Sequence, residues 1–340
     1  MKKIAIPHTL LVALSAMAMT SSFAQEASKD PINAAEAVRS ALAKKEGEGD
    51  NQKLLQDTLT AKDRQYSLLK AGKYAMAWDA SYAYSGVRQI NNDVTTNALI
   101  VNNLKSHTLT NNFSLDYGLR DDFAVNVSAP FVGRYSQSDT TDGKVSDMGD
   151  ISVGARFQPL PMDKDLPTIT LNTSVRLPTG SSPFKTFNAE GLSSGSGYTA
   201  VTGGVNVSKI MDPAALFGSV SVTYNLNASD LYQNRNGARL IEVDPGASIS
   251  FGAGFASALS YKVSTSLAYQ QTISNRSKLT YLKADNTKTV AKSVGSTSAM
   301  LNFGLGLRYT PVSTLNFTFG VGLTSDSPDF TFGVNMPLSF

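Results

Sequence analysis

Cysteine is absent from this chain of 340 residues, and charged residues make up only 17% of it. The lack of cysteine excludes a disulfide framework and any metal site built on thiolates. There are 30 basic and 27 acidic residues, or 28 and 27 once the two lysines beside the N-terminus, Lys2 and Lys3, are removed. A nearly neutral chain lacks the basic surface that nucleic acid requires. Scarce charge with abundant Gly, Ser, Thr and Asn is typical of strands between lipid and a polar interior.

Long apolar runs are also scarce. The run Leu10–Met19 follows two lysines and precedes Ser22 and Ala24, which have the small-x-small spacing of a cleavage site. This pattern predicts a secretory signal peptide over residues 1–24. The run is too short for a transmembrane helix, which needs about 20 apolar residues, and no later window is that long. If the remaining chain enters a membrane, it must do so as a closed barrel, which also satisfies its backbone hydrogen bonds in lipid.

The segment from residue 25 to 73 is rich in Ala, Lys, Glu, Gln and Leu, a helical composition. We interpret residues 25–50 as a periplasmic helical segment with a flexible joint, because "KKEGEGDNQ" combines glycine with mixed charge. Residues 51–73 are predicted to form a helix whose apolar positions alternate in steps of four and three, as in a coiled-coil seam. The sequence leaves two interpretations open, a coiled coil between chains and a helix that packs on the protein's own body as a plug. The seam consists of Leu55, Leu59, Lys62, Tyr66 and Leu69.

From Tyr74 onward apolar residues recur at every second position, which predicts β-strands with a different solvent on each face. Each strand is long enough for a tilted bilayer crossing of about 9–11 residues. Tight turns alternate with long polar connections, which predicts an all-β fold, a transmembrane antiparallel barrel of about 12 strands over residues 74–340, with both ends in the periplasm. The candidate strands are Tyr74–Ser85, Ser106–Gly118, Asp122–Tyr135, Asp150–Gln158, Pro167–Leu177, Tyr198–Ile210, Leu216–Asn227, Ala247–Ala256, Tyr261–Thr272, Ser298–Thr310, Leu315–Leu323 and Phe330–Phe340.

Parity separates an apolar face from a polar face in each predicted strand. On the apolar face Tyr117, Phe157, Tyr261, Tyr309 and Phe340 fall at the short-turn ends, where an aromatic girdle meets lipid headgroups. A soluble β-sandwich would also alternate, but it gives no reason for this alignment. The polar face should line a lumen, where charges contact a plug or a passing substrate. The charged residues predicted to lie there are Asp79, Asp116, Arg156, Arg176, Lys262 and Arg308.

Three patterns associated with enzymes or metals lack their usual context. Residues 191–195 spell G-x-S-x-G, but no strand-to-helix turn surrounds them, so we interpret them as a flexible loop. An outer-membrane phospholipase would carry Ser two positions after its His, yet Leu109 follows His107, which we assign to a girdle or rim. Four aspartates could offer oxygen ligands to a divalent cation, but we favour a solvated loop. We therefore predict no catalytic activity, cofactor or metal site; these aspartates are Asp139, Asp142, Asp147 and Asp150.

Several stretches resemble known transporters. "DMGDISVGARFQP" and "VRLPTGSSPF" are similar to motifs of the outer-membrane family named for meta-pathway phenol degradation. "LLQDTLTAKDRQYSLLKAGKYAMAWDASYAYSG", from Leu54 to Gly86, resembles the helix-to-first-strand junction of a related channel that secretes functional amyloid subunits. The resemblance implies a twelve-stranded barrel, a helical plug in the lumen and a periplasmic coiled coil that assembles trimers. The N-terminal region of this chain is short for such a coiled coil.

The main functional hypothesis is an outer-membrane channel that exports unfolded amyloid-type subunits through a plug-gated barrel. One alternative is passive uptake of small aromatic or hydrophobic solutes, and another is a structural or adhesive surface barrel. Expected partners are outer-membrane lipid, the barrel assembly machinery, a secreted amyloid subunit and, in a homotrimer, two further copies of the chain. Outer-membrane barrels resemble one another in ending on an aromatic residue that this machinery reads, so Phe340 is predicted to be an assembly signal. The chain should reside in the bacterial outer membrane with its N-terminal region in the periplasm.

Overall fold

The computed structural model describes residues 68–93, 98–138, 142–160, 166–185, 192–211, 213–235, 237–310 and 313–338. The chain divides into two compact units, Met1–Lys45 and Glu46–Phe340, and the described residues all belong to the second. The predicted signal peptide, the segment 25–50 and Phe340 lie outside these residues. No helix within the described residues is long and apolar enough to cross a membrane.

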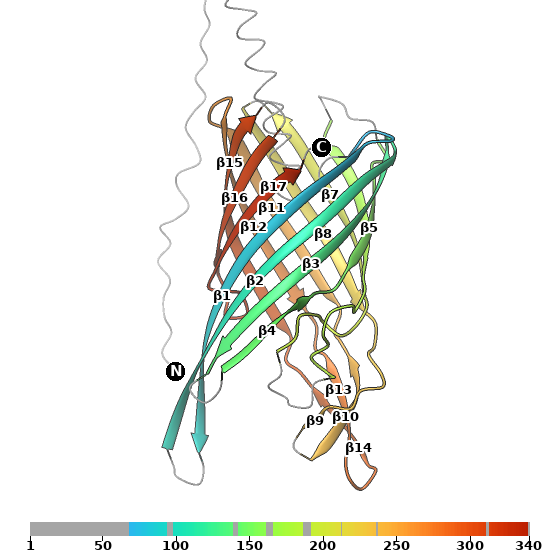
Figure 1. Ribbon diagram of the computed structural model, residues 1–340, viewed down its shortest axis with the longest axis vertical. Helices are drawn as coiled ribbons and strands as arrows, with labels where there is room; N and C mark the ends of the chain where they lie inside the picture. Colours follow the sequence, from blue (N-terminus) through green and yellow to red (C-terminus); the bar gives the residue numbers. More distant parts are fainter. Residues whose placement is uncertain are drawn as a thin grey trace, which may run out of the picture. The chain divides into compact units, whose positions relative to one another are not determined.

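The strands of the main sheet form a closed antiparallel barrel (Figure 1). β1 pairs with β17 on one side and β2 on the other, and β2 pairs with β3, so the sheet closes on itself. Of its 13 strands, β4 pairs with β3 alone among the described residues, which leaves twelve in the ring and confirms the predicted fold. The ring consists of β1 (Tyr74–Asp93), β2 (Ala98–Arg120), β3 (Phe123–Gln137), β5 (Ser152–Phe157), β6 (Thr168–Arg176), β7 (Ala200–Met211), β8 (Ala214–Asn225), β11 (Ser248–Ala258), β12 (Val263–Ser274), β15 (Ser296–Thr310), β16 (Ser313–Gly322) and β17 (Phe330–Leu338).

Two parts of the sheet extend beyond the predicted strands. β1 and β2 continue to pair as far as Asp93 and Ala98. β4 (Asp142–Met148) occupies a stretch that was predicted as a polar loop, yet it pairs with β3 from Phe131↔Met148 to Gln137↔Asp142. Neither addition alternates cleanly between apolar and polar residues, so the sequence carries no two-solvent signal there. Backbone hydrogen bonds maintain the pairing instead.

Large apolar side chains lie on the outer surface of the barrel, and small or polar ones face its interior. Leu115 and Phe303 are 44% and 51% exposed, whereas Ala124 and Ser264 are fully buried. Water-soluble proteins rarely expose contiguous apolar surface on this scale. An outward apolar band around a polar interior is the arrangement of a barrel in lipid.

Aromatic side chains mark two levels on the outer surface. Tyr74 and Tyr84 lie on one face of β1, ten positions apart. With a rise of about 3.3 Å per residue and a strand tilt of roughly 40°, they are separated by about 25 Å across the membrane, the usual height of the apolar band. Tyr74 pairs with Tyr117, a predicted girdle residue. The predicted girdle residues within the described chain are all exposed: Tyr117, Phe157, Tyr261 and Tyr309.

The long connections carry a second sheet, in the order β14-β13-β10-β9. It lies beyond the barrel end opposite the C-terminus in Figure 1 and consists of β9 (Asn234–Arg235), β10 (Ala238–Asp244), β13 (Lys278–Leu282) and β14 (Lys288–Lys292). At the β13–β14 turn the Thr287 hydroxyl donates to Asp285 at 2.6 Å, which lowers the pKa of that carboxyl. The sequence missed this sheet, whose core contains Ala228, Leu231, Leu240 and Val243, with Phe184 and Tyr198 packed against it.

The chain enters the barrel through an irregular segment. Residues 68–70 are neither helix nor strand, although the predicted helix extended to residue 73, so this end of the prediction is wrong. Gly72 donates its N–H to the Gly118 carbonyl, and Gly118 donates to the Lys73 carbonyl, both at 2.8 Å. These bonds hold the segment, including Leu69, against the end of β2. The other residues of the predicted seam, Leu55, Leu59, Lys62 and Tyr66, lie outside the described chain.

Candidate functional site

The inner surface of the barrel divides into an uncharged part and a charged part. On β7, β8, β11 and β12 the positions that alternate with the exposed apolar residues are Gly, Ala, Ser, Thr, Asn and Gln, apart from Ile210 and Phe217. None of these positions carries an ionisable side chain. The inward charges instead lie on β1, β2, β3, β5 and β6, and at the short-turn end of β15: Asp79, Asp116, Arg134, Arg156, Arg176 and Arg308.

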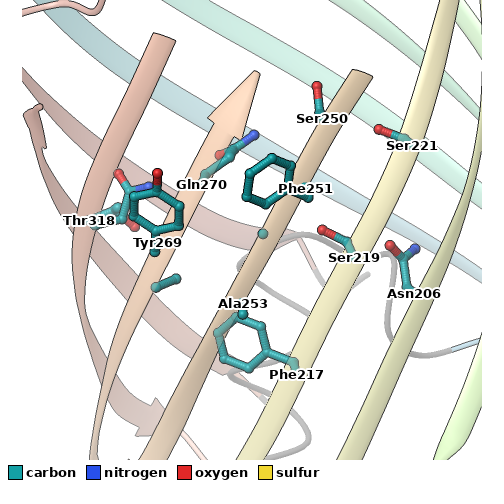
Figure 2. Close-up of a pocket in the computed structure, with 13 residues that line it drawn as sticks. Asn206, Phe217, Ser219, Ser221, Ser250, Phe251, Ala253, Tyr269, Gln270 and Thr318 are labelled. Atoms are coloured by element: carbon teal, nitrogen blue, oxygen red, sulfur yellow. The ribbon is translucent and has the colours of Figure 1, made fainter. Parts of the chain in front are cut away.

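A cavity of about 330 Å³ lies against the uncharged wall (Figure 2). Ser219 and Ser221 on β8 and Ser250 on β11 border it with hydroxyl groups, and Gln270 on β12 adds an amide. Phe217 supplies an aromatic surface. The volume is at the lower end of the range for small-molecule sites, about 300–1,000 Å³. Hydroxyl and amide groups donate and accept hydrogen bonds without a formal charge, which suits an uncharged solute with a polar group.

Phe217 departs from the polar character of this wall, and it was not among the residues predicted from the sequence. The side chain is 8% exposed and packs with Ala215, Ala256 and Ala268. Gly254, its pairing partner on β11, makes room for the ring, since a Cβ at that position would lie 2.7 Å from it. The signal in the sequence is that Phe breaks the alternation of β8.

Two predicted lumen residues form a buried ion pair. Arg156 Nη2 donates to Asp116 Oδ1 at 2.6 Å, and both side chains are 6% exposed. The pair links β2 to β5 across β3, where the small Ala124 pairs with Arg156 in the sheet. A buried pair of this kind tolerates the loss of one partner poorly, because the other charge remains desolvated.

Asp79 lies at the seam where the barrel closes. It is paired in register with Asn335, whose amide donates to the Asp79 carboxylate. This bond joins the first strand of the ring to the last. Asn335 was not among the site residues selected from the sequence.

Asp150, between β4 and β5, fastens the long β6–β7 connection to the wall. Its carboxylate accepts from the Gly180 N–H at 3.1 Å, and from the Ser196 N–H and hydroxyl at 2.7 and 2.5 Å. Arg176 Nε lies 3.8 Å from the same carboxylate. A Cβ on Gly180 would lie 2.8 Å from the Cα of Gly195, so the two backbones meet where no side chain fits. The stretches that resemble transporter motifs therefore meet at one carboxylate.

The remaining predicted lumen charges lie apart from the cavity. Arg176 is 41% exposed, and its guanidinium carbon lies 5.6 Å from the centre of the Tyr198 ring. Arg308 lies near the short-turn end of β15, where its N–H donates to the Lys262 carbonyl at 2.8 Å. Lys262 itself is exposed in the β11–β12 turn, with its Nζ 5.3 Å from the centre of the Tyr261 ring. Parity predicted that Lys262 lies in the lumen; in the structure it is the turn residue directly before β12, which starts at Val263.

The motifs set aside in the sequence have structural positions. Ser193 and Ser194 are buried rather than part of a loose surface loop, because the Ser194 and Ser181 side chains each accept from the other residue's N–H. His107 lies on the outer face beside Tyr82, whose hydroxyl is 2.8 Å from Nδ1. Within the described residues no group of three or more His, Cys, Asp or Glu side chains could hold a metal ion.

A closed twelve-stranded barrel with an exposed apolar exterior and a polar lumen defines a transmembrane β-barrel. Residues 77–340 match the model of the family described as "Putative MetA-pathway of phenol degradation", and the chain belongs to this family.

One of three solved structures similar to this chain supports the fold. An outer membrane channel from Pseudomonas putida F1 aligns with a TM-score of 0.59 and 16% identity, over 81% of this chain and 98% of that one. The Pseudomonas putida toluene transporter TodX aligns at 0.44 with 10% identity, over 78% and 91%. The translocator domain of the autotransporter NalP from Neisseria meningitidis aligns at 0.46 with 9% identity, over 91% and 98%. Of these three, the first exceeds 0.5 and supports a shared fold.

Proposed function

We propose that this protein is a passive channel of the bacterial outer membrane for small uncharged solutes that combine an aromatic ring with a hydrogen-bonding group. The observation that carries the proposal is the cavity that lies against the uncharged part of the lumen wall. The description of its family names phenol degradation, and the similar structure from Pseudomonas putida is an outer membrane channel, which support the proposal. Transport of this kind requires no catalytic group.

The cavity favours such solutes for a physical reason. An ion that leaves water needs a counter-charge or several hydrogen bonds, otherwise its desolvation is expensive. Ser250 and Gln270 can bind a hydroxyl group, but they do not compensate a full charge. Phe217 presents apolar surface for a ring, and aromatic pairs gain about 0.5–1.5 kcal/mol beyond the burial of area.

Current recordings in planar bilayers test this proposal. Benzyl alcohol and benzoate are similar in size but differ in charge at neutral pH, and we expect benzyl alcohol to interrupt the ionic current at lower concentration. Gln270→Leu should weaken this block about tenfold, because a lost hydrogen bond costs roughly 1–1.5 kcal/mol. The measurement is the blocking constant from single-channel records.

Thr110→Val is the matched control. Thr110 pairs with Ser81 on the charged side of the lumen, so the variant removes a hydrogen-bonding group away from the cavity. Benzyl alcohol should block this variant with the same blocking constant as the original chain. Equal block by benzyl alcohol and benzoate, or equal effects of the two substitutions, would count against the proposal.

Export of amyloid-type subunits is the alternative that the resemblance of Leu54–Gly86 suggested. The family match and the channel structure support uptake of small solutes better. Export would be favoured if an unfolded amyloid-type peptide crossed the bilayer through the channel and benzyl alcohol did not block the ionic current. A barrel without measurable conductance would favour the structural or adhesive role.

The N-terminal plug stays a prediction. If the segment before residue 68, which the sequence predicts as a helix, occupies the lumen, a chain that starts near Gly72 should conduct more current with less flicker, because that segment no longer competes with ions for a lumen of about twelve strands. The measurement is single-channel conductance of the full and shortened chains. Equal conductance would favour the coiled-coil or periplasmic-partner interpretation.

A further inference from the structure

An aromatic cluster covers the outer surface of β17, β1, β2 and β3 toward the long-loop end. The rings of Tyr84 and Phe330 are stacked with centroids 5.4 Å apart. The His107 ring lies 5.2 Å from Tyr84 and 5.9 Å from Tyr135. Tyr82 adds its hydroxyl, 2.8 Å from His107 Nδ1. The cluster lies at the aromatic level that Tyr84 marks, toward the long loops, and therefore at the height of the lipid headgroups.

Two lysines border the same cluster. Lys105 lies two positions from His107 on the same face of β2, and Lys144 is the pairing partner of Tyr135. Both are exposed. Among outward residues of the barrel strands whose side chains are described, these are the basic ones at the long-loop end. Positive charge and stacked rings therefore coincide in one sector of the circumference.

The carboxylates of this sector have other partners. Asp142 accepts the Tyr135 hydroxyl at 3.2 Å, and Asp329 accepts the Gly86 N–H at 2.8 Å. No ion pair engages Lys105 or Lys144 among the side chains that the structure describes. Two ammonium groups at headgroup height, next to aromatic rings, match a ligand that presents phosphate next to a sugar.

We propose that this sector, made of Tyr82, Tyr84, His107, Tyr135, Lys105 and Lys144, binds the phosphorylated sugar headgroup of an outer-leaflet glycolipid. The lysines contact phosphate and the rings pack against the sugar. The proposal rests on the outer-membrane placement given above, in which long connections face outward. It does not depend on the solute that the lumen carries.

Binding of lipid A to the purified full chain in detergent tests the proposal. Bisphosphorylated lipid A should bind to the original chain, and dephosphorylated lipid A with the same acyl chains should bind at least tenfold more weakly. Lys105→Gln with Lys144→Gln should weaken binding of the bisphosphorylated form about thirtyfold, since each of the two basic residues near an anionic lipid surface contributes roughly 1 kcal/mol. Native mass spectrometry gives the bound fraction.

Lys288→Gln with Lys292→Gln provides the matched control. These lysines are exposed on β14, in the sheet carried by the long connections, and the variant removes the same charge away from the barrel wall. It should bind lipid A like the original chain. Equal loss in both variants, or no preference for phosphorylated lipid A, would overturn the proposal. If the chain inserts and conducts but gives either of these results, this proposal alone is wrong. If the chain does not insert, the membrane placement is wrong.

Discussion

Replacing Arg156 with Met should lower the free energy of unfolding by about 3–5 kcal/mol, because it leaves the Asp116 carboxylate buried without its ion-pair partner. The two atoms that define the pair are 2.6 Å apart, and each side chain is 6% exposed. The chain contains one tryptophan, Trp78 on β1, so its fluorescence during urea unfolding in lipid vesicles reports the stability of the barrel.

The exposed pair Arg120–Asp122 gives a control in the same barrel. Its atoms are 3.1 Å apart, but the side chains are 75% and 37% exposed. Arg120→Met should therefore cost at most about 1 kcal/mol. A double variant, Asp116→Leu with Arg156→Met, should recover most of the stability, because no buried charge remains. Equal costs for Arg156→Met and Arg120→Met would contradict a stabilising role for the buried pair.

The ring of twelve strands was predictable because lipid and a polar lumen impose opposite demands on alternate residues. Phe330, Phe332 and Val334 alternate with Thr331 and Gly333 in the last strand, and the structure pairs this strand with β1. β4 and the sheet of β9, β10, β13 and β14 belong to stretches that the sequence analysis treated as polar connections. There the alternation disappears, and pairing depends on contacts that are distant in the sequence.

The candidate site was predictable in part. Parity identified Asp116 and Arg156 as inward residues, but their contact spans 40 positions and depends on the register of three strands. A register shift between Gly118 and Arg120 adds an irregularity that no local pattern reveals. Phe217 was missed because, in a single sequence, one apolar residue on a polar face cannot be distinguished from a chance exception to the alternation. The partner that makes room for it, Gly254, lies on another strand.

Asp150 is a second example of a residue whose contacts could not be predicted from the sequence. The sequence identified its neighbourhood as a transporter-like motif, and the carboxylate was considered as a metal ligand. The structure places it instead against Gly180 and Ser196. Glycines such as Gly180 and Gly195 mark close approach of two backbones, but which segments approach each other becomes visible only in the folded chain.

Asp150→Ala should release the β6–β7 connection from the wall while the barrel remains intact. The substitution removes the acceptor of three hydrogen bonds, so the N–H groups of Gly180 and Ser196 lose a partner in a site where the Asp150 side chain is 6% exposed. Each unsatisfied buried donor costs roughly 1–3 kcal/mol. We therefore expect protease cleavage between residues 177 and 199 to become at least tenfold faster, because local opening by more than 1.4 kcal/mol raises the open population tenfold. Limited proteolysis in vesicles, read by mass spectrometry, measures this rate.

Asp147→Ala is the matched control, since Asp147 is exposed and accepts the N–H of its own neighbour, Met148, at 2.8 Å. It should leave the cleavage rate unchanged. Rapid cleavage in both variants, or none in Asp150→Ala, would mean that other contacts, such as those of Ser181 with Ser194, suffice to hold the connection.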